Sequence, residues 1–337
     1  MKTKTISYIH TPPRSFCDQW ENNIAKLRAK LSAYFPKFAV DFWVKILGFF
    51  RRFVLQEFSQ SLRATDYIIT NSVNIQNRTQ KFLEIRANQV IYPAVHTAKF
   101  HFIGQKNYYH SHCRLESLKR IELIVAAFAG LPNQNLVITS SGPLENWLKN
   151  EIKTKNLTNI DFRGRVSDEE LVEIMGNCTA GIMIPVDEDA GITQIEFLAA
   201  GKPVIAVAEG GLLETICEEN LKNPQTKSVK NLEIAESLKK FVTNSQAIDF
   251  EIQNANQKNI IKDLETLEPK KENAENWQTG ILIPSSPSLE DLIIGITQMT
   301  PQLALSLRSN CEKSAQKYDQ KNFFEKLDQV VQSLLTK

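Results

Sequence analysis

Two carboxylates with seven residues between them, Glu188 and Glu196, are the residues of this sequence best placed to do chemistry. Residues 178–185 form an apolar run that ends in proline, which is typical of a buried strand running into a loop. Residues 186–191 are acidic and end in glycine, as a loop over a ligand would. Residues 192–200 have helical spacing. The spacing therefore places one carboxylate in a loop and the other about one turn into the next helix.

The elements after this helix indicate what positions the two acids. Gly201 stands where a helix C-cap belongs, and Lys202-Pro203 separates the helix from the apolar run 204–208. Strand, loop, helix and strand in this order form one unit of a parallel sheet. In open α/β sheets, ligands bind in the crevice at the carboxyl ends of the strands, which both acids would face.

The backbone at the start of the same helix favours an anion. The free N–H groups of Gly191, Ile192 and Thr193 would point into the crevice and could hold a phosphate. A simpler interpretation is that Glu188 is a solvated loop acid and that Glu196 complements the helix dipole. Either acid alone favours that simpler interpretation.

The whole segment resembles the donor-site signature of the retaining glycosyltransferases of family 4, an E-x7-E motif. It reads Glu188-Asp189-Ala190-Gly191-Ile192, then Glu196, then Leu198-Ala199-Ala200-Gly201-Lys202-Pro203-Val204-Ile205-Ala206. One departure is Ala190, where the family usually carries an aromatic residue. The resemblance implies that Glu188 holds sugar hydroxyls beside the reacting carbon and that Glu196 binds the ribose hydroxyls.

The composition of the chain is that of an ordinary globular protein. The chain has 337 residues, 42% hydrophobic and 23% charged, with a net charge of +2, which is ordinary for two globular domains. The near-neutral balance offers no electrostatic case for nucleic acid as a partner. The five cysteines are scattered, without CxxC or paired histidines, so we expect reduced thiols in a cytoplasmic protein and no metal site.

The start of the chain carries a second resemblance. Residues 6–9 predict a strand, and residues 8–14 resemble a Y-x-H-T-P-x-R segment of the mannosyltransferase-like branch of family 4, which serves polysaccharide assembly. By that resemblance the N-terminal domain is incomplete and lacks its first strands, its first helices and a glycine-rich phosphate loop. His10 is then the candidate cleft histidine, and Arg14 a candidate phosphate or acceptor contact. The alternative for His10 is a strand-end histidine held by the adjacent turn.

Residues 37–64 form a long, strongly helical stretch with aromatic residues crowded on one broad side and basic residues flanking it. One hypothesis is a helix lying on an anionic membrane face, which would give access to a lipid-linked acceptor. The interpretation we favour is a core helix of the N-terminal domain, since strong amphipathic patterns are common in buried helices.

Residues 66–70 and 90–93 predict further strands, and Ser72 caps the helix between them. Residues 90–95 resemble the V-I-Y-P-P-V that closes the N-terminal domain in the family. We therefore expect three parts: a partial N-terminal acceptor-side domain over 1–100, a donor domain over 101–310, and a helix over 311–337 that returns to the N-terminal domain.

The donor domain opens on a predicted strand at 107–112, followed by the basic loop 113–120. The loop resembles the family's S-R-L-x-x-x-K-(R/G) segment, with Cys113 in place of the usual serine. By resemblance, Arg114 and Lys119 grip the donor diphosphate. Positive charge is needed there to offset the negative charge that builds on a nucleoside diphosphate leaving group.

Three turns complete the resemblance. Gly142 lies in a segment similar to the family's G-(D/S)-G-P turn, without its first glycine. Val166 ends a G-x-V turn that in the family lies beside the nucleotide base. Gly210 and Gly211 begin a G-G-x-x-E turn that closes over the sugar and phosphates, where glycines let the backbone approach a ligand. A polar segment, about 218–277, then interrupts the pattern; we interpret it as a surface insertion with weak helical patterning at 229–243 and 251–266.

The resemblance implies an α/β protein with the GT-B fold, two Rossmann-like domains that face each other across a cleft, acting without a cofactor or metal. The expected function is transfer of a hexose, with GDP-mannose as the first guess, from a nucleoside-diphosphate sugar to a saccharide or lipid-linked acceptor in cell-surface polysaccharide synthesis. The protein is expected in the cytoplasm, with possible contact at the membrane surface. The alternative is a non-catalytic nucleotide-sugar-binding remnant, or one half of a split glycosyltransferase.

Overall fold

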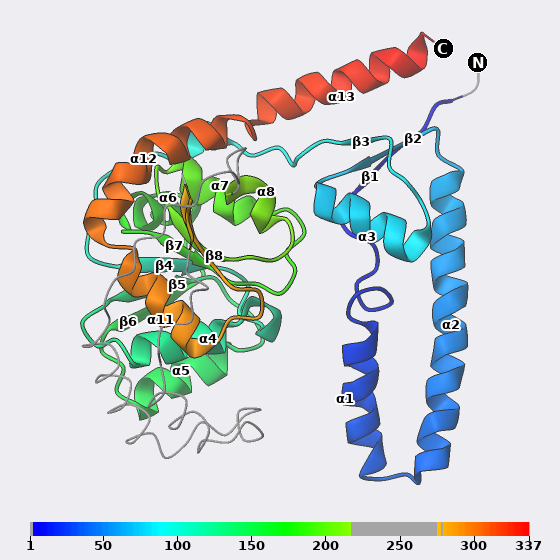
Figure 1. The fold of residues 1–337 in the computed structure, drawn as a ribbon, viewed down its shortest axis with the longest axis horizontal. Helices are drawn as coiled ribbons and strands as arrows, with labels where there is room; N and C mark the ends of the chain where they lie inside the picture. The colour runs from blue at the N-terminus through cyan, green and yellow to red at the C-terminus, as the bar shows by residue number, and fades with distance from the viewer. Residues whose placement is uncertain (1–2, 217–274, 278, 337) are drawn as a thin grey trace.

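The structure is a computed structural model that describes residues 3–216, 275–277 and 279–336. The expected insertion at about 218–277, with its helical patterning at 229–243 and 251–266, lies outside these residues except for the short strand at its end. The described chain forms two parallel-sheet units that stand beside each other, as Figure 1 shows.

The first unit is built on a three-stranded parallel sheet in the order β1-β2-β3. Its elements in chain order are β1 (Ile6–Ile9), α1 (Trp20–Ser32), α2 (Lys37–Arg63), β2 (Tyr67–Thr70), α3 (Val73–Leu83) and β3 (Gln89–Val90). The strand expected over 90–93 is therefore shorter and begins one residue earlier. Ser72 caps α3 as expected, because its side chain accepts a hydrogen bond from the Ile75 N–H at 3.0 Å.

The second unit, called the donor domain after the role that the sequence predicts for it, is built on a seven-stranded sheet in the order β6-β5-β4-β7-β8-β10-β9. Only β9, among the described strands of this sheet, runs antiparallel to its neighbour. Its elements are η1 (Thr97–Lys99), β4 (Tyr109–His112), η2 (Ser117–Lys119), α4 (Ile121–Ala129), β5 (Leu136–Thr139), α5 (Glu145–Thr154), β6 (Ile160–Gly164), α6 (Asp168–Asn177), β7 (Gly181–Met183), α7 (Ile192–Ala199), β8 (Val204–Val207), α8 (Leu212–Ile216), β9 (Glu275–Trp277), β10 (Gly280–Ile283), α11 (Leu289–Gln298) and α12 (Pro301–Gln316).

The sequence explains the central strands of this sheet. Every residue of β5, β7 and β8 is buried, since helices cover both faces of a parallel sheet and a strand between them must be apolar on both sides. The expected order of strand, loop, helix and strand around the two acids is present as β7, the loop 184–191, α7 and β8. The fold class predicted from the sequence, an α/β protein with two parallel-sheet domains, is confirmed.

The chain ends in two helices rather than in the single helix expected over 311–337. In α12, Ala304, Cys311 and Ala315 are buried in the donor-domain core. The last helix, α13 (Gln320–Leu335), instead packs on the first unit, where Val330 joins a buried cluster with Ile69 of β2. Figure 1 shows α13 leaving the donor domain at one end and reaching over the N-terminal sheet. The crossing therefore begins near Asp319, not at residue 311.

The helix over residues 37–64 is present as α2, but it is not a core helix. Only Val40 and Leu62 among its residues are buried, whereas Phe38 is 78% exposed and Phe49 is 77% exposed. The amphipathic pattern alone could not distinguish these outcomes, because an apolar stripe looks the same whether protein, lipid or water faces it. The structure corrects our preferred interpretation.

Candidate functional site

The loop that carries Glu188 lies at the carboxyl end of β7 and leads into α7. Gly191 is the N-cap of α7, with φ = 66°, and no side chain caps this helix end. A positive φ favours glycine, and a Cβ at this position would also lie 2.7 Å from the Leu212 side chain. The amino end of α7, with Ile192 exposed and Thr193 half-buried, therefore presents backbone N–H groups suited to an anion.

The Glu188 side chain meets the basic loop that follows β4. Lys119 of η2 places its Nζ 2.5 Å from Glu188 Oε2, and both side chains are about one-fifth exposed. The structure therefore brings together the acid expected to hold sugar hydroxyls and one of the two cations expected to hold the diphosphate. Lys119 and Glu188 are 69 residues apart in the sequence.

Arg114 lies in the same loop but points to solvent. Its side chain is 68% exposed, and its nearest acidic partner is Glu116, with Nε 3.6 Å from Oε2. Gly142 packs directly against the backbone of this loop, because a Cβ there would lie 2.5 Å from the Leu115 carbonyl oxygen. The close approach fixes the backbone next to Arg114 while its guanidinium stays available to a ligand.

The turn at Gly210 and Gly211 packs directly on the backbone of the Glu188 loop. Gly210 has φ = 60°, and a Cβ there would lie 2.5 Å from the Glu188 carbonyl oxygen. The Gly211 N–H donates to that same oxygen at 2.8 Å. These two glycines therefore act first on the position of Glu188, a role that the sequence pattern did not indicate.

Glu196 lies on the second turn of α7 and is half-buried. Burial raises the pKa of its carboxyl from 4.5 to about 7, while Lys99 lowers it and Asp168 raises it. A carboxyl with this pKa gains from hydrogen-bond donors that stabilise its ionised form. Ligand hydroxyls, such as those of a ribose, would supply such donors.

His10 and Arg14 lie on the first unit, in the loop after β1. His10 is exposed, and its ring meets that of Tyr8 edge-on with centroids 5.0 Å apart. Arg14 pairs with Asp18 at 2.8 Å, and its Nη2 also donates to the Val186 carbonyl oxygen of the donor domain at 3.3 Å. Arg14 therefore reaches the loop of Glu188, but its charge is largely matched by Asp18.

The remaining predicted contact, Val166, follows β6 and packs at the edge of the donor-domain core. The strand before it is tied to the Gly142 turn, since the Ser140 N–H donates to the Gly164 carbonyl oxygen at 2.6 Å. The two turns predicted to lie near the nucleotide are therefore neighbours at the carboxyl edge of the sheet.

Sequence reasoning missed the cation that holds the Glu188 loop from the other domain, Arg78 of α3. Its side chain is 3% exposed and contacts both acids that flank Glu188, Asp187 at 2.9 Å and Asp189 at 2.5 Å. Its Nη1 also donates to Thr11 Oγ1 at 3.1 Å, in the loop after β1. Burial acts to lower the pKa of Arg78, but Asp187, Asp189 and Asp18 outweigh it and raise that pKa.

Glu214 makes a second contact between the two units that the sequence analysis did not predict. The Glu214 carboxylate accepts hydrogen bonds from the Val73 N–H at 2.9 Å and the Asn74 N–H at 2.7 Å, at the amino end of α3. The Tyr92 hydroxyl donates to it at 2.7 Å. An anion at a helix amino end is favourable, so Glu214 holds the glycine turn against the first unit.

For Arg78, the sequence offered only a partial signal. The acidic run 187–189 indicated that a cation lies nearby, but nothing in the sequence identified Arg78 as that cation.

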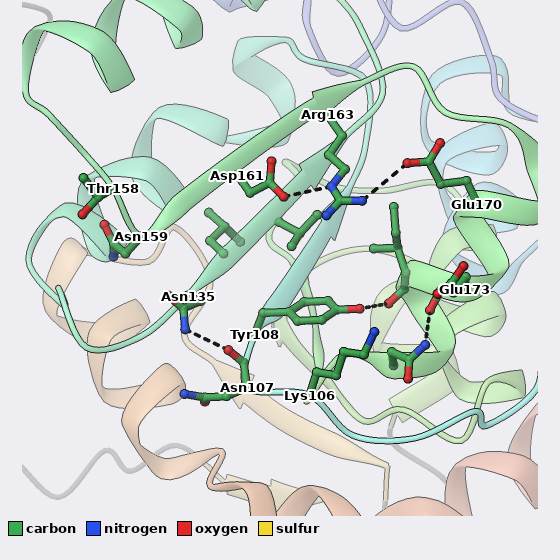
Figure 2. A pocket seen from close by; sticks show the side chains of 14 residues that line it. Lys106, Asn107, Tyr108, Asn135, Thr158, Asn159, Asp161, Arg163, Glu170 and Glu173 are labelled. Carbon is green, nitrogen blue, oxygen red and sulfur yellow. Dashed lines mark hydrogen bonds and ion pairs between the residues drawn. The ribbon is translucent and has the colours of Figure 1, made fainter.

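A cavity of about 580 Å³ lies elsewhere, as Figure 2 shows. Its walls include residues that precede β4, β5 and β6, among them Tyr108, Asn135 and Asn159. It therefore opens at the amino ends of these strands, opposite the edge that carries Glu188. The ion pair between Arg163 and Asp161, at 2.8 Å, lines it. The cavity is no part of the candidate donor site.

Comparison with known protein families supports the interpretation of the donor domain. Residues 96–263 match the family of glycosyl transferases group 1. An uncharacterized glycosyltransferase of Methanocaldococcus jannaschii is 27% identical over 161 residues, which cover 48% of this chain and 45% of that protein. The alpha-1,3/1,6-mannosyltransferase ALG2 of Dictyostelium discoideum is 39% identical over 88 residues, 25% of this chain and 21% of that protein. The chain thus spans less than half the length of these curated relatives.

The chain is also similar in fold to solved structures. Sucrose-phosphate synthase from Thermosynechococcus elongatus superposes with a TM-score of 0.60 at 18% identity, over 84% of this chain and 61% of that one. Anabaena HepE, solved in complex with UDP and glucose, gives 0.53 at 15% identity, over 80% of this chain and 64% of that one. At such identities the likeness establishes the fold, which is GT-B, and not the substrate.

Proposed function

We propose that the protein is a retaining glycosyltransferase of family 4, on the premise that residues 96–263 match the family of glycosyl transferases group 1 and that the fold is GT-B. It would move a hexose from a nucleoside-diphosphate sugar to a saccharide or lipid-linked acceptor. The observation that carries the proposal is the meeting of Lys119 with Glu188 beside the uncapped amino end of α7.

The proposed diphosphate site is made of three sources of positive charge. Arg114 is exposed beside the strand edge, Lys119 lies in the same loop, and the amino end of α7 faces them across the Glu188 loop. As the bond to the sugar breaks, negative charge gathers on the leaving diphosphate. Cations and helix N–H groups placed in advance stabilise that charge without rearranging.

The two acids take different tasks in this proposal. Glu188 exchanges its contact with Lys119 for hydroxyls of the donor sugar and so fixes the reacting carbon. Glu196, with its raised pKa, accepts hydrogen bonds from the ribose. A glycosidase is disfavoured, because that chemistry needs two carboxylates on opposite sides of the scissile bond. Both acids here belong to one loop-helix connection.

The donor is proposed to be GDP-mannose. The support is the Y-x-H-T-P-x-R resemblance at residues 8–14, together with the similarity of part of the chain to the ALG2 mannosyltransferase. Val166 and Gly142 would lie near the base and contact it mainly through backbone atoms. No cofactor is proposed.

On the acceptor side, His10 is proposed as the cleft histidine that contacts the reacting sugars, and Arg14 as a contact to an acceptor or phosphate. A lipid-linked acceptor for cell-surface polysaccharide would bring the protein to the cytoplasmic face of a membrane. No helix in the described part of the chain has the length and apolar character needed to cross a bilayer.

Release of GDP from GDP-mannose tests this proposal, measured with and without saccharide acceptors. The expected result is acceptor-stimulated release that falls at least about a hundredfold in Glu188→Gln, in line with the loss of one preorganised transition-state contact. The transferred mannose should keep the α configuration of the donor by NMR. Release that is unchanged in Glu188→Gln would contradict the assigned role, and an inverted product would contradict retention.

A further inference from the structure

The helical hairpin formed by α1 and α2 leaves a large aromatic surface uncovered. Figure 1 shows the two helices side by side, extending away from the N-terminal sheet and separate from the donor domain. The exposed apolar residues of the hairpin, here called the aromatic face, are Tyr34, Phe35, Phe38, Phe42, Trp43, Ile46, Phe49, Phe50 and Phe53, each between 41% and 78% exposed.

The aromatic face is a continuous stripe rather than a scatter of side chains. At 3.6 residues per turn, Phe38, Phe42, Phe49 and Phe53 align along one side of α2. The opposite side carries the two buried residues of the helix, Val40 and Leu62. Since α2 has 27 residues, the stripe lies along a helix of roughly 40 Å.

The charge of the hairpin is opposite to that of an anionic surface. Residues 20–63 hold eight basic and three acidic side chains, a net charge of +5, in a chain whose total is +2. Lys45 and Arg52 lie along one border of the aromatic face, while Trp43 and Phe50 lie along the other. Within the described residues, Lys37, Lys45 and Arg52 take part in no ion pair, so their charges are available.

We propose that the aromatic face of the α1–α2 hairpin is a docking surface for a membrane of anionic phospholipids. A helix with one apolar side and basic residues beside it lies in the plane of the interface, with aromatic side chains among the acyl chains and cations at the headgroups. Aromatic rings such as that of Trp43 suit this boundary because one end tolerates water.

A second copy of the chain fits the surface less well. Two hairpins of net charge +5 placed face to face would repel each other, whereas anionic headgroups neutralise that charge. The helix is also unsuited to spanning the bilayer, because Lys45, Arg51 and Arg52 fall in its middle. If α2 lies in the plane of an anionic interface, its basic residues reach the headgroups and its aromatic residues reach the acyl chains.

Docking through this surface would place the His10 loop, which leads into α1, near the headgroups. The statement that the acceptor lies in this membrane rests on the proposed glycosyl transfer. Vesicle binding itself requires no donor, so the two proposals can fail separately.

Flotation of the full-length protein with vesicles tests the proposal directly, without nucleotide sugar. Vesicles of phosphatidylcholine alone would be compared with vesicles containing about one-third phosphatidylglycerol. We expect binding to the anionic vesicles only, reduced by salt because the attraction between charges is screened. The double variant Phe42→Gln/Phe49→Gln should lower the partition coefficient at least about tenfold, and Lys45→Gln/Arg52→Gln should weaken it similarly on anionic vesicles.

Matched controls are available on α12 and α13, the last two helices of the chain. Phe324 of α13 is 59% exposed, as is Phe42, and Phe324→Gln should leave binding unchanged. Lys313→Gln/Lys326→Gln removes two exposed cations outside the hairpin and should also leave it unchanged. Circular dichroism would verify that each variant keeps its helices. Three results would overturn the proposal: no flotation, equal loss in the control variants, or concentration-dependent dimerisation abolished by Phe42→Gln/Phe49→Gln.

Discussion

Lys119 and Glu188 form an ion pair, with Nζ and Oε2 2.5 Å apart. The cation is proposed to bind diphosphate and the acid to bind sugar hydroxyls, so the contact between them must be exchanged for the ligand. The ion pair fixes the position of both side chains until that exchange occurs. It also lowers the affinity for any ligand that engages only one partner.

The first prediction follows from this pairing. Glu188→Gln should bind GDP more tightly than the native protein, by roughly threefold to tenfold, because Lys119 is released and a negative charge next to the phosphates is removed. Isothermal titration calorimetry would measure the affinity. Glu173→Gln, an exposed acid in α6 by the cavity at the opposite edge of the sheet, is the control and should leave the affinity unchanged. Weaker GDP binding in Glu188→Gln would contradict the pairing as described.

The second prediction concerns Glu196 and pH. Because burial raises its pKa from 4.5 to about 7, the folded state holds a proton that the unfolded state releases between these values. Its contribution to folding stability is therefore complete below about pH 4.5 and is lost as the pH rises through 7. Glu196→Gln stays neutral, so at pH 8 it should exceed the native protein in stability by on the order of 1 kcal/mol, allowing for partial exposure.

Urea unfolding at pH 5 and pH 8 would measure this difference, which should shrink or vanish at pH 5. The same variant should lose donor affinity at pH 8, since an amide binds ribose hydroxyls less strongly than a carboxylate. A Glu196→Gln protein that is less stable than the native one at pH 8 would show that the carboxylate is compensated by partners in the fold.

The third prediction uses two glycines in different surroundings. Gly210→Ala should destabilise the fold by about 2 kcal/mol or more and weaken donor binding, because the new Cβ meets the Glu188 backbone and φ is positive. Gly48 lies in α2 with nothing within 4 Å of an added Cβ. Gly48→Ala should therefore be neutral or stabilising, by about 0.5–1 kcal/mol, through helix propensity. Thermal unfolding compares them, and equal effects would refute the tight contact at Gly210.

The fourth prediction tests the cation that sequence analysis missed. Arg78→Ala should cost about 2 kcal/mol, since it leaves two partly exposed aspartates without their buried arginine. Arg78→Lys should recover part of the stability but less of the activity, because one ammonium cannot hold both flanks of Glu188 as a guanidinium does. Arg165→Ala removes an exposed arginine and should change stability by less than about 0.5 kcal/mol. A similar loss in both alanine variants would contradict the clamp.

Much of the fold could be read from local patterns. The run 204–207 is apolar on both faces, and Ser72 signalled a helix start, because these features depend on neighbouring residues alone. The environment of α2 could not be read this way, since exposure depends on what packs against the helix. The break near Asp319 was missed because both of its flanks are helical.

The same distinction between local patterns and distant contacts applies to the candidate site. The motif placed Glu188, Lys119 and Gly210 in one set, and the structure brings these three together. The contacts of Arg78 and Glu214 join segments more than a hundred residues apart, and no spacing in the sequence records such a pair. Arg114 and Glu196 lie at the same sheet edge, and we propose that both bind the nucleotide sugar.

Donor binding is the most direct test of the central claim, measured as thermal shifts with GDP-, UDP- and ADP-sugars. A ligand that binds only the folded state raises the unfolding midpoint once its concentration exceeds its dissociation constant. We predict a shift with one nucleotide, GDP, that is lost in Arg114→Ala, whose side chain is exposed and contributes little to folding, and in Glu196→Ala. No shift with any nucleotide sugar, from protein shown to be folded, would contradict the donor site and the proposed transfer together.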